Sequence, residues 1–139
     1  MAKRDTIHYA VRNALEKDDW EVTDDPLNVK IEGSRGIEID LGAEKFIAAK
    51  KGKEEIAVEV KTFGGGSVLN DFHTALGQYL DYQDALEEGN IDRELFIAVP
   101  EEVYETIENF PFILRRIQKY ELKFVVININ QEKVIKWIK

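Results

Sequence analysis

The stretch Ile56-Ala57-Val58-Glu59-Val60-Lys61 decides both the fold and the candidate chemistry of this chain. It begins as a short apolar run of the kind that forms a buried strand, and it ends in a carboxylate and an ammonium group two residues apart. Successive side chains of a strand point to opposite faces of a sheet, so Glu59 and Lys61 share one face. The stretch therefore predicts a strand with two charged side chains lying side by side near its end.

A second strand is predicted directly upstream. Phe46–Ala49 is another short apolar run, and Lys50-Lys51-Gly52-Lys53-Glu54-Glu55 between the two runs has the composition of a hairpin turn. If the turn centres near Gly52, the residue facing Glu59 is about Phe46, and the residue facing Lys61 is about Glu44.

The remaining elements follow from periodicity and from the positions of Pro and Gly. The patterns predict helices over 5–18, 70–87, 101–108 and 112–120, and strands over 20–23, 29–32, 37–41, 95–99, 123–128 and 134–138. The continuous apolar run at 95–99, ended by Pro100, is typical of a strand buried on both faces in a parallel arrangement. The order of elements predicts one domain over residues 1–139, with a mixed central β-sheet flanked by helices.

The composition restricts the class of protein. The 139 residues include no cysteine, and no run approaches the roughly 18 apolar residues of a membrane span. No apolar targeting segment follows Met1-Ala2-Lys3-Arg4, so we expect a cytoplasmic protein without membrane contact. The net charge of −8 argues against a protein that coats nucleic acid, and any contact with DNA is expected to be local.

Two local groups of cations stand out in this acidic chain. Lys50, Lys51 and Lys53 lie at the predicted hairpin turn, and Arg115, Arg116 and Lys119 lie at the end of a predicted helix. Sequence alone favours an ordinary solvated surface for each group.

Glu59 and Lys61 have the chemistry needed for phosphodiester hydrolysis. Such hydrolysis uses a divalent cation to neutralise the phosphate and to lower the pKa of bound water, and Mg²⁺ prefers a few carboxylates plus waters. Lys61 would orient the attacking water or stabilise the charge that develops on phosphorus. The pattern alone is not specific, because Glu121-Leu122-Lys123 repeats it and because a solvent-facing cross-strand ion pair has the same spacing.

Three further features favour a metal site. An upstream carboxylate is available, either Asp40 or Glu44. Glu16, late in the first helix, is a candidate for the outer shell of the metal, although a solvated helix residue is the plainer interpretation. Gln78 and Tyr82 are four residues apart in the longest predicted helix, so they share a face from which they can hold a carboxylate, the lysine or a phosphate.

An Asp, a strand ending in Glu59-Val60-Lys61 and a helix with a Gln-x-x-x-Tyr pattern together resemble the PD-(D/E)XK nuclease class. A longer set of segments, spread over essentially the whole chain, is similar to the XisH family of fdxN-element excision controlling factors. These segments are Ile39-Asp40-Leu41-Gly42-Ala43-Glu44-Lys45, Ile56–Lys61, Ala75-Leu76-Gly77-Gln78-Tyr79-Leu80, Ala98-Val99-Pro100-Glu101 and Val134-Ile135-Lys136-Trp137-Ile138.

The resemblance implies a restriction-endonuclease-like core and a cofactor, Mg²⁺ or Mn²⁺. Asp40 and Glu59 would be metal ligands, Lys61 would be catalytic, and Gln78 and Tyr82 would support them. It also implies a role in programmed, site-specific DNA excision in the heterocyst-forming, nitrogen-fixing cyanobacteria, alongside a recombinase and a companion factor, XisI.

The sequence departs from the nuclease pattern upstream of the hairpin. The usual Asp stands close to opposite the Glu of its hairpin, whereas Asp40 lies further out and has no Pro directly before it. A bulge or kink at Gly42 would bring Asp40 back, so we prefer Asp40 as the second ligand and keep Glu44 as the alternative.

Three functional hypotheses remain. The first is a metal-dependent endodeoxyribonuclease, and the second is a catalytically silent accessory protein that binds XisI and regulates the recombinase. The third is DNA binding without cleavage. Fold alone does not decide among them, and each is compatible with a homo-oligomer.

Overall fold

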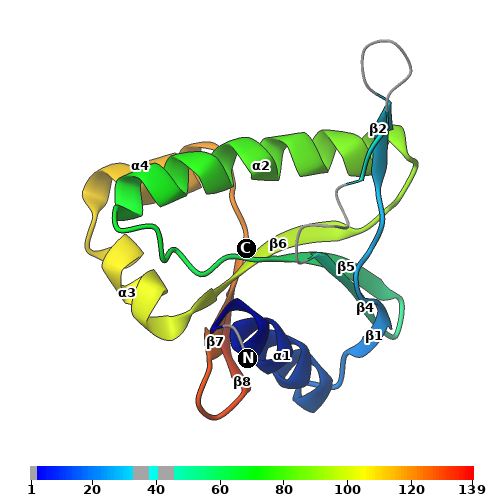
Figure 1. Ribbon diagram of the computed structural model, residues 1–139, viewed down its shortest axis with the longest axis horizontal. Helices are drawn as coiled ribbons and strands as arrows, with labels where there is room; N and C mark the ends of the chain where they lie inside the picture. Colours follow the sequence, from blue (N-terminus) through cyan, green and yellow to red (C-terminus); the bar gives the residue numbers. More distant parts are fainter. Residues whose placement is uncertain (1–2, 33–37, 41–45) are drawn as a thin grey trace.

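A six-stranded sheet forms the centre of the part of the chain that the structure, a computed structural model, describes: residues 3–32, 38–40 and 46–139 (Figure 1). The strand order is β1-β4-β5-β6-β7-β8, with β1 at Glu21–Asp24, β4 at Phe46–Lys51, β5 at Glu54–Val60, β6 at Glu94–Pro100, β7 at Phe124–Asn128 and β8 at Lys133–Ile138. Helix α1 (Lys3–Lys17) covers one face, and α2 (Val68–Glu88), α3 (Glu101–Glu108) and α4 (Pro111–Lys119) cover the other. The predicted mixed sheet flanked by helices is confirmed, and the element bounds differ from the predicted ones by at most two residues where both are described.

The pairing of the strands follows from their connections. β4 and β5 form the predicted antiparallel hairpin, with Gly52 at φ +61 in its turn and Phe46 directly opposite Glu59. The connections from β5 through α2 to β6, and from β6 through α3 and α4 to β7, are long crossovers, so both pairs are parallel. β8 returns antiparallel to β7 and forms one edge of the sheet, as predicted.

Strands β2 (Lys30–Glu32) and β3 (Glu38–Asp40) pair only with each other among the described residues. They are antiparallel, with Lys30 opposite Asp40, and they form a second, two-stranded sheet between β1 and β4 in sequence. The strand that was expected to carry Asp40 therefore exists, but the structure places it outside the central sheet.

Alternation along the strands divides the core into two halves. Ile56, Val58 and Val60 of β5 pack in the cluster beneath α1, whereas Ala57 packs in the cluster beneath α2, α3 and α4. Glu59 and Lys61 continue the series of Ala57, so both side chains leave the sheet on the α2 face.

Helix α2 is held at both ends. The Ser67 side chain caps its start by accepting a hydrogen bond from the Asn70 N–H at 3.2 Å, and Gly89 ends it. Within the described residues, none of the helices is both long enough and apolar enough to cross a membrane.

Candidate functional site

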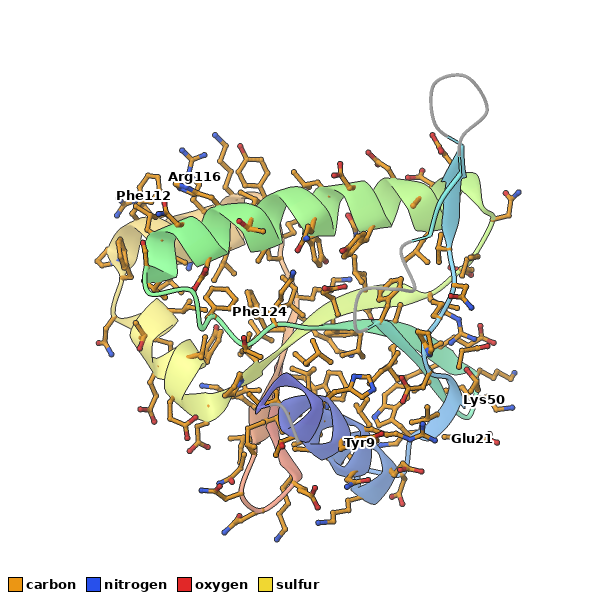
Figure 2. The ribbon with its side chains drawn as sticks, viewed as in Figure 1. Tyr9, Glu21, Lys50, Phe112, Arg116 and Phe124 are labelled. Carbon is orange, nitrogen blue, oxygen red and sulfur yellow. The ribbon has the colours of Figure 1, made fainter. Side chains whose placement is uncertain are left out.

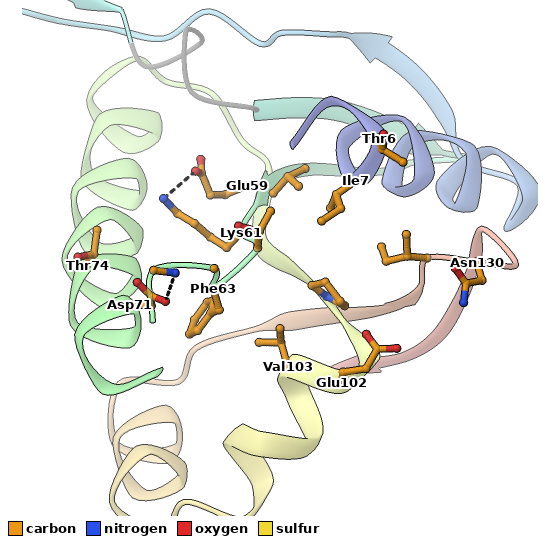
Figure 3. A pocket seen from close by; sticks show the side chains of 16 residues that line it. Thr6, Ile7, Glu59, Lys61, Phe63, Asp71, Thr74, Glu102, Val103 and Asn130 are labelled. Atoms are coloured by element: carbon orange, nitrogen blue, oxygen red, sulfur yellow. Dashed lines mark hydrogen bonds and ion pairs between the residues drawn. The ribbon is translucent and has the colours of Figure 1, made fainter. Parts of the chain in front are cut away.

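A cavity of about 760 Å³ opens where the parallel strands β5 and β6 end (Figure 3). Its walls are the end of β5, the loop that leads to α2, the first turns of α1 and α3, the first two turns of α2, and the segment after β7. The carboxyl ends of parallel strands are the usual place for a ligand site in an open α/β sheet. The cavity is therefore the candidate site on position alone.

Glu59 and Lys61 meet in this cavity. The Lys61 Nζ lies 3.4 Å from the Glu59 Oε1, and the two side chains are 20% and 4% exposed (Figure 3). The Lys61 N–H donates to the Ala98 carbonyl at 2.9 Å, which extends the β5–β6 ladder one residue beyond Val60 and fixes where the lysine leaves the sheet. The arrangement is a buried carboxylate beside a partly buried ammonium group, rather than a solvent-facing ion pair.

The burial of Glu59 is energetically costly. Its neighbours Ala57 and Val58 in β5 are fully buried apolar residues. Moving a carboxylate out of water costs several kcal/mol even after the protein relaxes, and an ion pair repays that cost only in good geometry. A buried carboxylate in a cavity therefore makes Glu59 a candidate functional residue.

Gln78 and Tyr82 lie on α2, which covers the face of the sheet that carries Glu59 and Lys61. Tyr82 is 3% exposed, and its ring centroid lies 5.4 Å from that of Phe46, the register partner of Glu59. Gln78 is half-buried, and its Oε1, which is closed off from solvent, accepts no hydrogen bond from the described residues. Helix α2 thus places the Tyr82 ring against Phe46, directly across the hairpin from Glu59, and the Gln78 amide lies one helical turn before Tyr82.

Tyr79, between these two residues, serves the core instead. Its hydroxyl donates to the buried Leu95 carbonyl at 3.2 Å. Burial raises the pKa of Tyr79 to about 12, because the phenolate form would lose its hydration.

The glycine-rich segment after Lys61 is pinned to α2. The Gly65 N–H donates to the Asp71 Oδ2 at 3.0 Å, and a Cβ at Gly65 would clash with that same carboxylate. Phe63 at φ +52 and Gly66 at φ +89 turn the chain on either side of this contact. A side chain at position 65 would therefore displace the Asp71 carboxylate from this contact.

Three residues with a carboxylate or amide side chain line the cavity although sequence reasoning did not single them out: Asp71, Glu102 and Asn130. Glu102 lies in the first turn of α3, directly after β6, and Asn130 follows β7. The signal for Glu102 was present, because an acidic pair directly after a predicted parallel strand lies at the same sheet edge as the end of the neighbouring strand. Asp71, in the first turn of α2, and Asn130, in the segment after β7, reach the cavity through the course of the chain, and no sequence pattern predicts their place in it.

Of the other predicted site residues, Glu16, Gln78 and Tyr82 are not among the residues that line this cavity. The backbone of Asp40 is in β3, and Glu44 lies outside the described residues, so the choice between them stays a prediction. Glu16 is exposed on α1, and its Oε1 lies 3.7 Å from the Arg12 Nε, an i,i+4 pair of the solvated kind.

The second Glu-x-Lys pattern, Glu121-Leu122-Lys123, lies away from the cavity. Glu121 is exposed, and Lys123 Nζ lies 2.7 Å from the Glu94 Oε2 at the amino ends of β6 and β7, the sheet edge opposite to the cavity. The lysine of that pattern therefore pairs with Glu94 rather than with Glu121, near the start of two strands.

The donor set fits a hard divalent cation in part. Within the ranges that the structure describes, no three His, Cys, Asp or Glu side chains gather closely enough to form a metal site by themselves. Glu59 supplies one buried carboxylate in a cavity with room for waters, and Mg²⁺ is commonly held by one or two carboxylates plus waters. The described residues therefore fit Mg²⁺ together with one further carboxylate.

Comparison with known proteins gives a consistent result. The family model described as XisH protein matches residues 1–135. A crystal structure of an fdxN element excision controlling factor protein from Anabaena variabilis is 39% identical and covers 98% of this chain and 100% of its own, with a TM-score of 0.86. A crystal structure of an XisH family protein from Nostoc punctiforme is 38% identical and covers 96% and 99%, with a TM-score of 0.85. No curated protein matches.

Proposed function

Because the chain belongs to the XisH family, we propose that it is an excision controlling factor for the fdxN element and that its Glu59–Lys61 site is a Mg²⁺-dependent endonuclease site. The observation that carries the nuclease assignment is the buried Glu59 carboxylate with the Lys61 ammonium 3.4 Å away at the mouth of the cavity. Buried charged groups in a cleft are candidates for a functional site.

Each residue has a distinct role in this proposal. Glu59 and one upstream carboxylate, Asp40 or Glu44, would hold Mg²⁺ or Mn²⁺, which neutralises the phosphate and lowers the pKa of bound water when present. Lys61 donates a hydrogen bond to the attacking water or to a non-bridging phosphate oxygen.

The α2 residues act as positioning residues. Tyr82 packs on Phe46 and so holds the hairpin strand opposite Glu59 in place. Gln78 offers an amide whose Oε1 is buried, on the same helix face and one turn nearer to Thr74 in the cavity wall. Both are expected to set the orientation of the Glu59 and Lys61 side chains.

A nicking assay on supercoiled plasmid tests the nuclease assignment. We expect cleavage by the purified protein with Mg²⁺ or Mn²⁺ and none with a chelator. Glu59→Gln and Lys61→Ala should each reduce the rate by at least about 100-fold, the usual cost of losing one electrostatic group in an active site. Glu121→Gln, in the second Glu-x-Lys pattern, is the matched control and should cut at the wild-type rate. No metal-dependent cleavage, or cleavage indifferent to both substitutions at the site, would show that the assignment is wrong.

The second metal ligand is settled by a pair of substitutions. Asp40→Asn and Glu44→Gln each remove one charge and keep the shape of the side chain. The substitution that abolishes both cleavage and Mn²⁺ binding, followed by calorimetry, identifies the ligand, and we expect this to be Asp40. Full metal binding by Asp40→Asn would transfer the role to Glu44.

A second function is favoured by a separate observation. No group of three metal-binding side chains gathers among the described residues, and the chain carries a net charge of −8. Both fit a catalytically silent accessory protein that binds XisI and regulates the recombinase. Native mass spectrometry of the co-expressed pair tests this: a complex unaffected by Glu59→Gln supports it, and the absence of a complex contradicts it.

A further inference from the structure

Helix α4 presents a cationic and aromatic face to solvent. Ile113 and Ile117 are buried against the core, whereas Phe112 and Tyr120, the residue after the helix, are 38% and 37% exposed. Phe112 and Arg116 lie on the outer side of the helix (Figure 2). The Arg116 guanidinium lies 4.9 Å from the Phe112 ring centroid and 6.0 Å from that of Tyr120. Positions 112, 116 and 120 are one turn apart, so they form a ladder of ring, guanidinium and ring along one side of the helix.

Two further cations complete the face. Lys119 Nζ lies 5.6 Å from the Tyr120 ring centroid, and Arg115 is exposed beside Arg116. No acidic residue occurs in Pro111–Lys119. The helix therefore carries three positive charges in a chain whose net charge is −8.

The cations of α4 differ from most others in the described ranges. Nine of the others form ion pairs with carboxylates: Arg12, Lys17, Lys50, Lys51, Lys61, Arg93, Lys123, Lys136 and Lys139. Arg115, Arg116 and Lys119 form no ion pair with any described residue, and aromatic rings, not carboxylates, hold Arg116 and Lys119 in place. The helix dipole stabilises cations near a helix C-terminus, but that effect does not account for exposed aromatic residues among them.

We propose that this face of α4 binds the phosphodiester backbone of duplex DNA. The inference rests on the proposed function for its choice of DNA as the ligand. Duplex DNA presents one negative charge per roughly 1.7 Å of its axis, and guanidinium groups match phosphate oxygens in a planar, two-pronged geometry. Three cations within about 6 Å along a helix fit that density of charge better than the scattered carboxylates of a protein surface.

The position of α4 supports this ligand. α4 packs against α3, whose first turn contributes Glu102 and Val103 to the cavity, and both helices lie at the same end of the molecule (Figure 1). α4 thus lies next to an element that lines the cavity, and its cations add an attraction for DNA that the acidic remainder of the protein does not offer. α4 supplies the local DNA contact that the net charge of the whole chain does not.

Fluorescence anisotropy with a labelled duplex, in chelator and over a range of salt, tests the proposal. The test variant is Arg115→Gln/Arg116→Gln/Lys119→Gln. Each phosphate contact contributes about 0.9 to the slope of log affinity against log salt, so the variant should lose about 2.7 from the slope. Between 50 and 200 mM salt, wild-type affinity should then fall about 40-fold more than the affinity of the variant.

The matched control removes the same charge elsewhere. Lys50→Gln/Lys51→Gln/Lys53→Gln changes the β4–β5 turn at the sheet edge opposite to the cavity and should keep the wild-type slope. Thermal unfolding of each variant shows that the fold persists. An unchanged slope in the α4 variant, an equal loss in the control, or no duplex binding by the wild type overturns the proposal. An α4 variant that keeps DNA binding but loses an acidic protein partner also overturns it, in favour of a protein-docking surface.

The outcome is independent of the nuclease assignment. If the wild type binds duplex through α4 but never cuts it, the proposed catalysis fails and this inference stands. If the wild type cuts DNA but the α4 variant keeps the full salt slope, this inference fails and the catalysis stands.

Discussion

The Glu59–Lys61 pair predicts an asymmetric response to single substitutions. At 3.4 Å the charges attract by about 5 kcal/mol at an effective dielectric of about 20, an upper bound before desolvation is subtracted. Lys61→Met removes the cation beside a carboxylate that is 4% exposed, and we expect it to cost about 2–3 kcal/mol, below the usual 3–5 for a fully buried pair because Lys61 is 20% exposed. Glu59→Gln leaves a lysine that can turn to solvent, so its cost should stay within about 1 kcal/mol.

Thermal unfolding with and without Mg²⁺ measures this asymmetry. For a chain of this length, about 2–3 kcal/mol lowers the Tm by roughly 6–12 °C. Metal at ten times its Kd should restore about 1.4 kcal/mol to Lys61→Met, because the carboxylate survives, and nothing to Glu59→Gln. The double variant Glu59→Leu/Lys61→Met removes both charges and should be at least as stable as the wild type while lacking nuclease activity. Equal losses in the two single variants, or equal metal responses, would refute the reasoning.

Three further predictions concern α2 and the loop before it. Gly77→Ala should raise stability by about 0.5–1 kcal/mol in a denaturant titration, because Gly77 is inside the helix with open space at its Cβ position, whereas Gly66→Ala at φ +89 should lower it. Gly65→Ala should reduce cleavage by displacing the Asp71 side chain from the cavity wall, and an unchanged rate would mean that this contact does not shape the site. The pKa of Tyr79 is raised from about 10 in the unfolded chain to about 12 in the folded protein. Its contribution to the free energy of unfolding is therefore complete below pH 10 and is lost as the pH rises through about 12. Tyr79→Phe should flatten the fall of the free energy of unfolding between pH 10 and 12 relative to the wild type.

Local patterns predicted the parts of the fold that depend on local chemistry. The turn composition around Gly52 fixed the hairpin, and with it the register that places Phe46 opposite Glu59. The apolar run ended by Pro100 identified a strand that is parallel to both of its neighbours. These features follow from residues close together in sequence, where turn geometry and alternation leave few choices.

The order of the strands in the sheets could not be predicted from local sequence patterns in the same way. β1 skips two strands to pair with β4, and β2 and β3 pair with each other, because pairing partners are chosen by burial of whole faces rather than by order along the chain. The cavity wall shows the same limit. Asp71 and Asn130 come to line the same cavity as Lys61 only after the crossover helices have folded back on the sheet, so no spacing in the sequence marks them.

Burial is what separates the two Glu-x-Lys patterns of this chain. Glu121 is exposed, and Lys123 pairs with Glu94 at the amino ends of strands, where an ion pair is worth about 0–1 kcal/mol and no ligand site is expected. Glu59 lies at the carboxyl end of a strand and is buried on a face of the sheet whose other buried residues are apolar. An apolar residue at this position would be at least as favourable for stability alone. The same two residue types at the same spacing thus mean a surface contact in one place and a candidate catalytic pair in the other. The two patterns therefore differ both in burial and in which end of a parallel strand they occupy.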